Sequence, residues 1–237
     1  MGEDYVVVIK DLKKIYRRKG IEKDSLNGVN LKIKRGEMLA IVGPSGSGKS
    51  TLLNMLGALD KPTEGSVVID GVDISKIDDN RRADFRNKKI GFVFQSYNLI
   101  NRLKVVDNVE LPLMLLEVPQ ETRRSLALSM LREVGLDSKS FKKPTQLSGG
   151  EQQRVAVARA LVTQPSIILA DEPTGNLDSK SGAVVVSLLR ELARKGNTVI
   201  VVTHNMEVAR AADRIIYIRD GKIEKEEVVS MVQVEKT

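Results

Sequence analysis

The most informative stretch of the sequence is Gly43-Pro44-Ser45-Gly46-Ser47-Gly48-Lys49-Ser50-Thr51. It follows an apolar run over residues 38–42, which has the composition of a buried strand, and it precedes a helical pattern over residues 49–59. Glycines let consecutive backbone N–H groups turn inward, and a helix N-terminus adds a partial positive charge. The stretch therefore predicts a loop that binds the phosphates of a nucleotide.

The end of this loop carries the predicted phosphate and metal contacts. We expect Lys49 to bridge the β- and γ-phosphates of ATP, Ser50 to give a hydroxyl ligand to Mg²⁺, and Thr51 to lie near the α-phosphate. The chain has no cysteine and a single histidine, His204, so its metal ligands are mainly oxygen atoms. The predicted cofactors are ATP and Mg²⁺. The plainer alternative is a glycine-rich turn that opens a helix without binding phosphate.

The rest of the chain alternates between short β-branched runs and helical patterns, which is typical of an α/β fold. Runs at 38–42, 166–170 and 198–203 are apolar on both alternating faces, as in central parallel strands covered by helices. The other predicted strands cover residues 5–9, 66–69, 90–94 and 214–218. Asp220-Gly221 then predicts a tight turn into an antiparallel strand over 222–226.

The strand pattern disappears between Gln95 and about residue 153, where segments 105–117 and 121–134 have helical patterns. We interpret residues 95–157 as a helical subdomain inserted into an α/β core that consists of residues 1–94 and 158–237. Further helices are predicted over residues 151–163, 179–195 and 205–211. No apolar run approaches the roughly 18 to 20 residues that cross a bilayer.

Two adjacent carboxylates, Asp171 and Glu172, end the predicted strand over residues 166–170. Open α/β sheets bind their ligands at the carboxyl ends of their strands, so both side chains point to the predicted nucleotide. We expect Asp171 to join the magnesium shell and Glu172 to take a proton from the attacking water. The alternative is an acidic cap on a helix, which Pro173 and the strongly apolar preceding run disfavour.

A second glycine-rich helix start is Leu147-Ser148-Gly149-Gly150-Glu151. The first loop is expected to hold the phosphates of one ATP. A second helix N-terminus that binds anions would therefore bind either another nucleotide or the nucleotide of another subunit. The sequence leaves both possibilities open. An ordinary helix cap would explain Ser148 but not the two consecutive glycines.

The order of phosphate loop, Gln95, Leu-Ser-Gly-Gly-Glu, Asp171-Glu172, Asp178 and His204 resembles the ATP-binding cassette (ABC) ATPases over nearly the whole chain. The resemblance implies a P-loop nucleoside triphosphatase (NTPase) core with an antiparallel β subdomain, and head-to-tail homodimers. In such dimers Ser148 and Gly150, with their neighbours Gly149 and Glu151, bind the nucleotide held by the other subunit.

The same resemblance assigns roles to single residues. It implies that Tyr16 stacks on adenine, that Gln95 touches magnesium and water, and that His204 contacts the γ-phosphate and orders Glu172. Asp178 matches the dimer-contact loop, although the family commonly has Ser-Ala where this chain has Gly175-Asn176.

Two classes of cellular role are compatible with an ABC ATPase. The first is the ATPase subunit of a transporter at the cytoplasmic face of the cell membrane, with integral membrane permease subunits as partners. The segment 95–117 is similar to the lipoprotein-release and macrolide-export subgroup, although it departs from it at Asn101-Arg102-Leu103-Lys104. The second is a DNA-repair or chromosome-maintenance ATPase, which the net charge of +7 would suit. The chain has neither cysteine nor a long coiled coil, so we favour the transporter and expect no nucleic acid partner.

Overall fold

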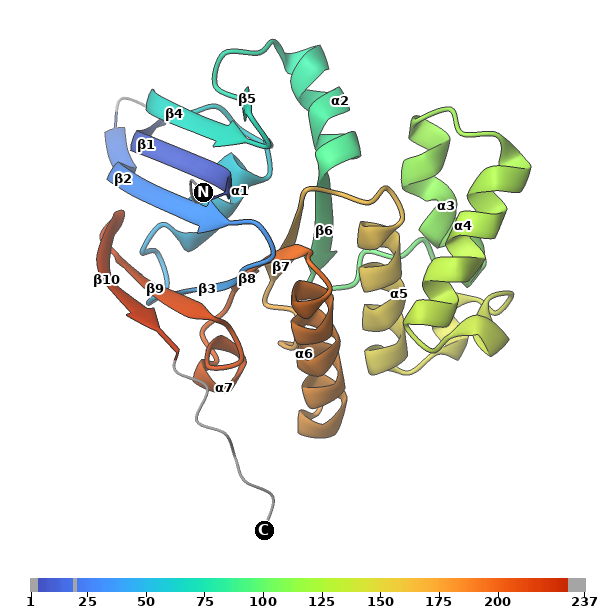
Figure 1. Ribbon diagram of the computed structural model, residues 1–237. Helices are drawn as coiled ribbons and strands as arrows, with labels where there is room; N and C mark the ends of the chain where they lie inside the picture. The colour runs from blue at the N-terminus through green and yellow to red at the C-terminus, as the bar shows by residue number, and fades with distance from the viewer. Residues whose placement is uncertain (1–3, 19–20, 230–237) are drawn as a thin grey trace.

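Two β-sheets organise the protein, as the computed structural model shows for residues 4–18 and 21–229 (Figure 1). The larger sheet has the strand order β10-β9-β3-β8-β7-β6, and all its neighbours are parallel except β9 and β10. Its strands are β3 (Met38–Val42), β6 (Ile90–Phe94), β7 (Ile167–Asp171), β8 (Thr198–Val202), β9 (Arg214–Arg219) and β10 (Lys222–Val228). The predicted α/β fold with a mainly parallel sheet is confirmed.

The smaller sheet is antiparallel and has the order β2-β1-β4-β5. It consists of β1 (Tyr5–Arg18), β2 (Ile21–Lys34), β4 (Glu64–Ile69) and β5 (Val72–Asp73). This sheet is the antiparallel β subdomain that the family resemblance implied. It lies at one end of the molecule, and helices α3 and α4 lie at the other (Figure 1).

Seven α-helices connect and cover the sheets in the described part of the chain. They are α1 (Lys49–Leu56), α2 (Asp79–Lys89), α3 (Val105–Leu115), α4 (Gln120–Glu133), α5 (Gly149–Leu161), α6 (Ser179–Arg194) and α7 (Met206–Ala209). Two short 3-10 helices, Asp137–Lys139 and Pro144–Gln146, lead from α4 to α5. Within the described ranges no helix is both long and apolar enough to span a bilayer.

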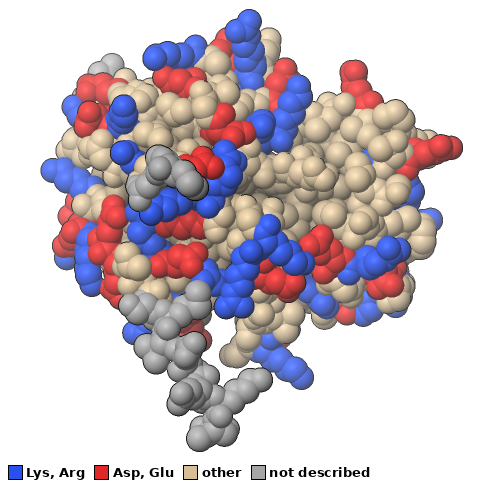
Figure 2. Space-filling model, viewed as in Figure 1, with Lys and Arg blue, Asp and Glu red and all other residues tan. Residues whose placement is uncertain are grey.

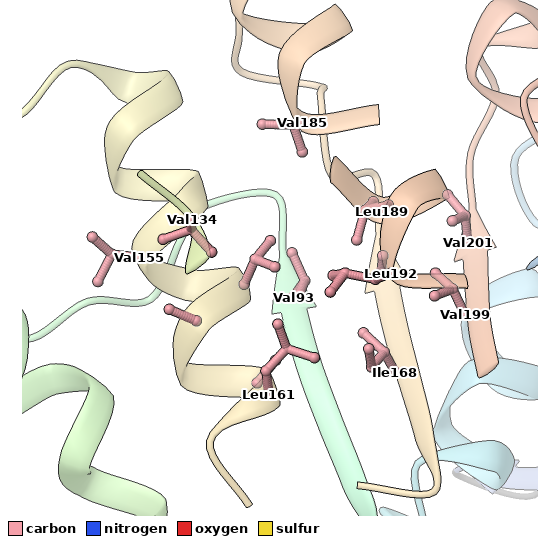
Figure 3. Close-up of a cluster of buried hydrophobic side chains, with 14 of the residues drawn as sticks. Val93, Val134, Val155, Leu161, Ile168, Val185, Leu189, Leu192, Val199 and Val201 are labelled. Atoms are coloured by element: carbon pink, nitrogen blue, oxygen red, sulfur yellow. The ribbon is translucent and has the colours of Figure 1, made fainter. Parts of the chain in front are cut away.

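The central strands are buried on both faces because their residues alternate between two apolar clusters. In β3, Met38 and Ala40 pack on the side of α5 and α6, whereas Leu39 and Ile41 pack against α1 and the antiparallel sheet. Figure 3 shows the first cluster, where Leu189 and Leu192 of α6 meet strand residues such as Val199. Each fully buried aliphatic side chain contributes about 1.5–3 kcal/mol. This double burial produces the unbroken apolar runs seen in the sequence.

Three sequence expectations need correction. The run over residues 5–9 is the start of a 14-residue strand, and its partner β2 was not predicted. Helix α2 was also missed, since none of its residues is fully buried and its sequence shows no apolar stripe. The helix expected over 151–163 begins two residues earlier, at Gly149, and ends at Leu161. The predicted subdomain boundary between residues 157 and 158 falls inside this continuous helix, and the division stays a prediction.

Candidate active site

Four parallel strands end in register at one edge of the larger sheet. In neighbouring strands Phe94 pairs with Asp171, Asp171 with Val202, and Val202 with Ile41. The residues that follow this row include Gln95, Glu172, Thr203 and the phosphate loop, which begins at Gly43. The sheet therefore brings together four chain segments that are far apart in the sequence, and most of the predicted chemistry lies on them.

Close backbone packing requires two of the loop glycines. A Cβ atom on Gly43 would lie 2.2 Å from the carbonyl oxygen of Ile218, and one on Gly48 would lie 2.5 Å from that of Ser25. Gly48 also has a φ of +107°, which side chains rarely adopt. Behind the loop, the N–H of Gly221 donates to Ser47 O at 2.9 Å. The β9–β10 turn and strand β2 thus fix the curvature of the loop.

Helix α1 begins directly after this loop without a side-chain cap. Gly48 occupies the N-cap position in a left-handed conformation, and it provides no side-chain cap hydrogen bond to the first turn. The ammonium group of Lys49 donates to the carbonyl oxygens of Gly43 and Pro44, at 2.7 and 2.8 Å. Uncapped donors, the positive end of a helix and a lysine at one loop form a site for an anion.

The predicted base, Glu172, has a carboxylate held by two residues that follow β8. Thr203 Oγ1 donates to Glu172 Oε2 at 3.0 Å, and the backbone N–H of His204 donates to Oε1 at 3.0 Å. The Nδ1 atom of His204 lies 2.7 Å from the same Oε1. Glu172 itself has a left-handed backbone with φ of +46°. The structure therefore brings Glu172 and His204 together, as the family resemblance implied.

The neighbouring Asp171 is half-buried at the end of β7. Burial raises the pKa of its carboxyl above the ordinary value, the charge of Glu172 raises it further, and the charge of Lys49 opposes the rise. Asp171 is consequently within electrostatic reach of both predicted catalytic groups.

Gln95 follows β6 and is paired with Asn176, in the loop between β7 and α6. Gln95 Nε2 donates to Asn176 Oδ1 at 3.1 Å, and Asn176 Nδ2 donates to the main-chain oxygen of Gln95 at 3.1 Å. Asp178, two residues further, caps α6 by accepting from Ser181 N at 2.9 Å. These contacts join two predicted nucleotide-contacting segments within one subunit.

The start of α5 carries its own cap. Ser148 Oγ accepts from the N–H of Glu151 at 3.3 Å, and Glu151 Oε2 accepts from the N–H of Ser148 at 3.0 Å. A Cβ on Gly149 would lie 2.8 Å from the hydroxyl of Tyr97, and one on Gly150 would lie 2.9 Å from the Cβ of Ser181. Close packing inside the subunit thus gives a reason for the two glycines that the sequence did not reveal.

Tyr16, the predicted adenine contact, lies near the end of β1 and is 40% exposed. Its hydroxyl donates to Asp60 at 3.2 Å, and Lys14 Nζ lies 5.0 Å from its ring centroid. Burial and, secondly, the charge of Asp60 raise the pKa of Tyr16. The ring is accessible to a planar ligand, and its stacking role stays a prediction.

Sequence reasoning missed several residues that hold the site. Thr203 and Asn176 contact the predicted base and the predicted metal ligand directly. Gln153 of α5 donates to the carbonyl oxygens of Phe94 and Pro173, at 3.2 and 2.7 Å. No motif identifies such residues, because their partners are backbone oxygens or side chains far away in the chain.

The residues present fit Mg-ATP. The uncapped α1 start, Lys49 and the inward-turned loop suit the phosphates, and the Ser47 hydroxyl is buried without a hydrogen-bond partner in the described structure. No cluster of three His, Cys, Asp or Glu side chains occurs among the described residues. A magnesium site that uses a serine hydroxyl, one or two protein oxygens and phosphate does not require such a cluster.

Comparisons with known proteins agree with this geometry. A family model described as ABC transporter matches residues 26–175. An uncharacterized ABC transporter ATP-binding protein of Thermotoga maritima is 51% identical over 219 residues, which cover 92% of this chain and 94% of the relative. The macrolide export ATP-binding/permease protein MacB of Vibrio parahaemolyticus is 50% identical over 220 residues. That match covers 93% of this chain but 34% of MacB.

Solved structures show the same similarity. The ATP-binding cassette MJ0796 of Methanocaldococcus jannaschii, in a dimeric post-hydrolysis state bound to ADP and Pi, superposes with a TM-score of 0.85 at 49% identity. The match covers 94% of this chain and 99% of that one. The chain therefore belongs to the ABC transporter family. Within it, the chain is an ATP-binding subunit with ATPase activity, and these relatives give no support to the DNA-repair alternative.

Proposed function

We propose that this chain hydrolyses Mg-ATP in a homodimer and uses the hydrolysis to drive a permease from the cytoplasmic face of the membrane. The observation that carries the proposal is the Glu172 carboxylate, which Thr203 and His204 hold at the strand end beside the phosphate loop. A carboxylate fixed by three contacts is oriented before substrate arrives, so it can accept the proton of an attacking water.

The other residues divide the work of binding. Lys49 and the first-turn N–H groups of α1 bind the phosphates, with Thr51 beside them, while Ser50, Asp171 and Gln95 supply oxygen atoms to the metal. Bound Mg²⁺ neutralises charge on the phosphate oxygens. The Nδ1 atom of His204 donates to the Glu172 carboxylate, so its Nε2 atom is the ring nitrogen left to face a phosphate. Nε2 donates there only when the ring is the doubly protonated imidazolium.

The second glycine-rich start completes the site across a dimer. MJ0796 is dimeric in its solved structure, at 49% identity to this chain. In the proposed dimer, Ser148 and Gly150 of one subunit contact the nucleotide of the other, and Asp178 lies in the contact loop between subunits. The positive end of α5 is suited to a phosphate once the Ser148 hydroxyl turns from its own helix to donate.

A groove between α2, β6, α3 and α5 is the proposed docking surface for the permease. It encloses about 560 Å³ and its lining includes Leu59, Phe92, Pro112 and Leu115. Leu59 is 45% and Leu115 is 75% exposed. Figure 2 shows few charged side chains on the face near α3, whereas charges of both signs cover the antiparallel sheet. An apolar element of a membrane protein suits this surface. By similarity to MacB, we infer that the transporter exports or extracts its substrate.

The replacement Glu172→Gln tests the proposed base. It keeps the size and the hydrogen-bonding reach of the side chain but removes its ability to accept a proton. We expect ATP binding to persist, turnover to fall by at least about 100-fold, and an ATP-dependent dimer to accumulate because product release no longer opens it. The measurements are steady-state ATPase activity and size-exclusion chromatography with light scattering.

The matched control is Glu207→Gln, which removes an exposed carboxylate from the first turn of α7. It should leave turnover unchanged. If Glu172→Gln hydrolysed ATP at the wild-type rate, Glu172 would not be the base.

The replacement Leu115→Glu tests the docking surface. A carboxylate on this 75% exposed position should prevent an apolar membrane element from entering the groove, while hydrolysis by the isolated chain stays unchanged. Tagged wild-type chain should retain a membrane protein from detergent-solubilised membranes, and the variant should retain at least about tenfold less. Equal retention by both would place the permease contact elsewhere.

A further inference from the structure

Gln95 and Asn176 lie 81 residues apart in the chain and form a two-bond pair beside the site. One bond joins the two side chains, and the other joins the side chain of Asn176 to the main chain of Gln95. The pair connects the end of β6 to the loop between Glu172 and helix α6. It is the direct link between the predicted metal ligand and the predicted dimer-contact loop.

The chemistry of the pair fixes which way both amide groups face. The main-chain oxygen of Gln95 can only accept a hydrogen bond, so Asn176 must present its Nδ2 atom to it. The Oδ1 atom of Asn176 then faces the Gln95 side chain, which must offer its own donor, Nε2. The one atom of the Gln95 amide that the pair does not use is Oε1. This oxygen is also the only atom of the amide that can ligate a hard divalent cation.

The residue before Asn176 makes room for this arrangement. A Cβ on Gly175 would lie 2.5 Å from Gln95 Nε2 and 2.9 Å from Gln95 Cδ. Any side chain at position 175 would therefore displace the Gln95 amide from Asn176. The Ser-Ala sequence that is common in the family lacks the amide at 176 and has a Cβ at 175. Gly175-Asn176 thus allows a pairing that Ser-Ala does not.

Other contacts hold the segment without setting the orientation of the Gln95 amide. The hydroxyl of Tyr97 donates to the main-chain oxygen of Asn176 at 3.4 Å. Arg159 of α5 donates to the main-chain oxygens of Tyr97 and Asn98. Removing one of these contacts would loosen the segment but leave the amide pair intact, which provides a control.

We propose that Asn176 is a positioning residue that keeps the Oε1 atom of Gln95 available to the divalent cation of the bound nucleotide. The proposal rests on the proposed role of Gln95 as a metal ligand. Without Asn176 the amide of Gln95 can rotate by half a turn and present Nε2, which repels a cation. Metal affinity is then coupled to the position of the loop that precedes Asp178, since movement of that loop breaks the pair.

The test measures binding of Mn²⁺, used as a paramagnetic substitute for Mg²⁺, to the ATP-bound protein. All variants carry Glu172→Gln, so that ATP is not consumed, and free Mn²⁺ is determined by electron paramagnetic resonance. We expect Asn176→Ala and Gly175→Ala each to weaken Mn²⁺ binding about three- to tenfold, the range of one lost hydrogen bond. The control Tyr97→Phe removes the other contact to Asn176 and should bind Mn²⁺ as the parent does. Thermal unfolding without nucleotide checks that the variants are folded.

Two further variants separate the possible outcomes. If Asn176 acts through Gln95, the double variant Gln95→Ala/Asn176→Ala binds Mn²⁺ no more weakly than Gln95→Ala alone. The proposal is overturned if Gln95→Ala weakens binding while Asn176→Ala does not, or if the two effects multiply. Unchanged Mn²⁺ binding by Gln95→Ala would instead refute the proposed metal role of Gln95, on which the inference depends.

Discussion

Helices α1 and α5 both begin after glycine-rich turns, yet their first turns differ. The start of α1 has no side-chain cap, and the ammonium group of Lys49 lies over the loop. The start of α5 has a complete capping box, in which Ser148 and Glu151 accept from each other's N–H groups. The first leaves its backbone donors for a ligand, whereas the second partly satisfies its donors within the subunit.

In the proposed dimer, this difference gives a reason why one phosphate site is formed by a single chain and the other needs two. Glycines alone do not distinguish the two starts, because Gly149 and Gly150 have packing reasons against Tyr97 and Ser181. What distinguishes them is the residue at the N-cap, a glycine in α1 and a serine in α5. A serine can cap its own helix in the free subunit and donate to a phosphate in the dimer. In the proposed dimer the α5 start is thus a half-site, which exchanges its own cap for a contact to the partner's phosphate.

Two substitutions of Ser148 separate these functions and have the largest expected effects. Asp caps helices as well as Ser does, so Ser148→Asp should retain the free energy of unfolding. Its negative charge should repel a partner's γ-phosphate and lower turnover at least about 100-fold. Ser148→Ala loses the cap and should cost about 1 kcal/mol of stability. Urea denaturation and ATPase assays on both variants measure the two effects.

The control for the cap is Asp78→Ala at the start of α2, where Asp78 accepts from Arg81 N at 2.9 Å. It should cost a similar free energy of unfolding and leave turnover unchanged. Normal turnover by Ser148→Asp would show that Ser148 faces no phosphate.

A smaller effect concerns the pH dependence of the α5 start. The ion pair with Lys139 and the hydrogen bond from Ser148 N lower the pKa of Glu151 in the folded state. A lowered folded-state pKa means that this stabilisation is present above the unfolded value and is lost as the pH falls through the folded one. Glu151→Gln should therefore be less stable than the wild type at about pH 7, by less than about 1 kcal/mol, and the difference should vanish at an acidic pH below the lowered folded-state pKa.

Urea denaturation at both pH values provides the measurement. Glu121→Gln is the matched control, because Glu121 lies in the first turn of α4, where no side-chain cap forms. A constant difference between Glu151→Gln and the wild type at all pH values would contradict the assignment to the carboxylate.

The parts of the fold that the sequence predicted are those with local signals. The parallel strands are continuous apolar runs because they are buried on both faces, and the Asp220-Gly221 turn has positive φ values of +46° and +73°. Strand β2 was missed because its apolar residues are separated by Lys, Asp and Asn around Gly28. Helix α2 was missed because, apart from Ala83 and Phe85, its sequence is polar. These two elements depend on tertiary contacts rather than on their own periodicity.

The candidate site divides in the same way. Lys49, Asp171 and Glu172 could be predicted because a strand or helix end stands beside each in the sequence. Their supporting residues could not be predicted, because the contacting residues are far apart in the sequence. Thr203 lies 31 positions from Glu172, and Asn176 lies 81 positions from Gln95. A sequence pattern records which groups carry the chemistry, whereas the orientation of those groups is set by contacts that only the fold brings about.

The most direct test of the account is a mixing experiment that asks whether sites are shared. Lys49→Ala removes the proposed phosphate-binding lysine of α1, and Ser148→Asp blocks the proposed half-site of α5, so each variant alone should be inactive. In a mixed dimer one site combines an intact Lys49 with an intact Ser148 from the other subunit. An equal mixture should therefore regain up to about a quarter of wild-type turnover, since half of the dimers are mixed and each has one intact site. If no mixing ratio gave more activity than the separate variants, the composite site would be contradicted.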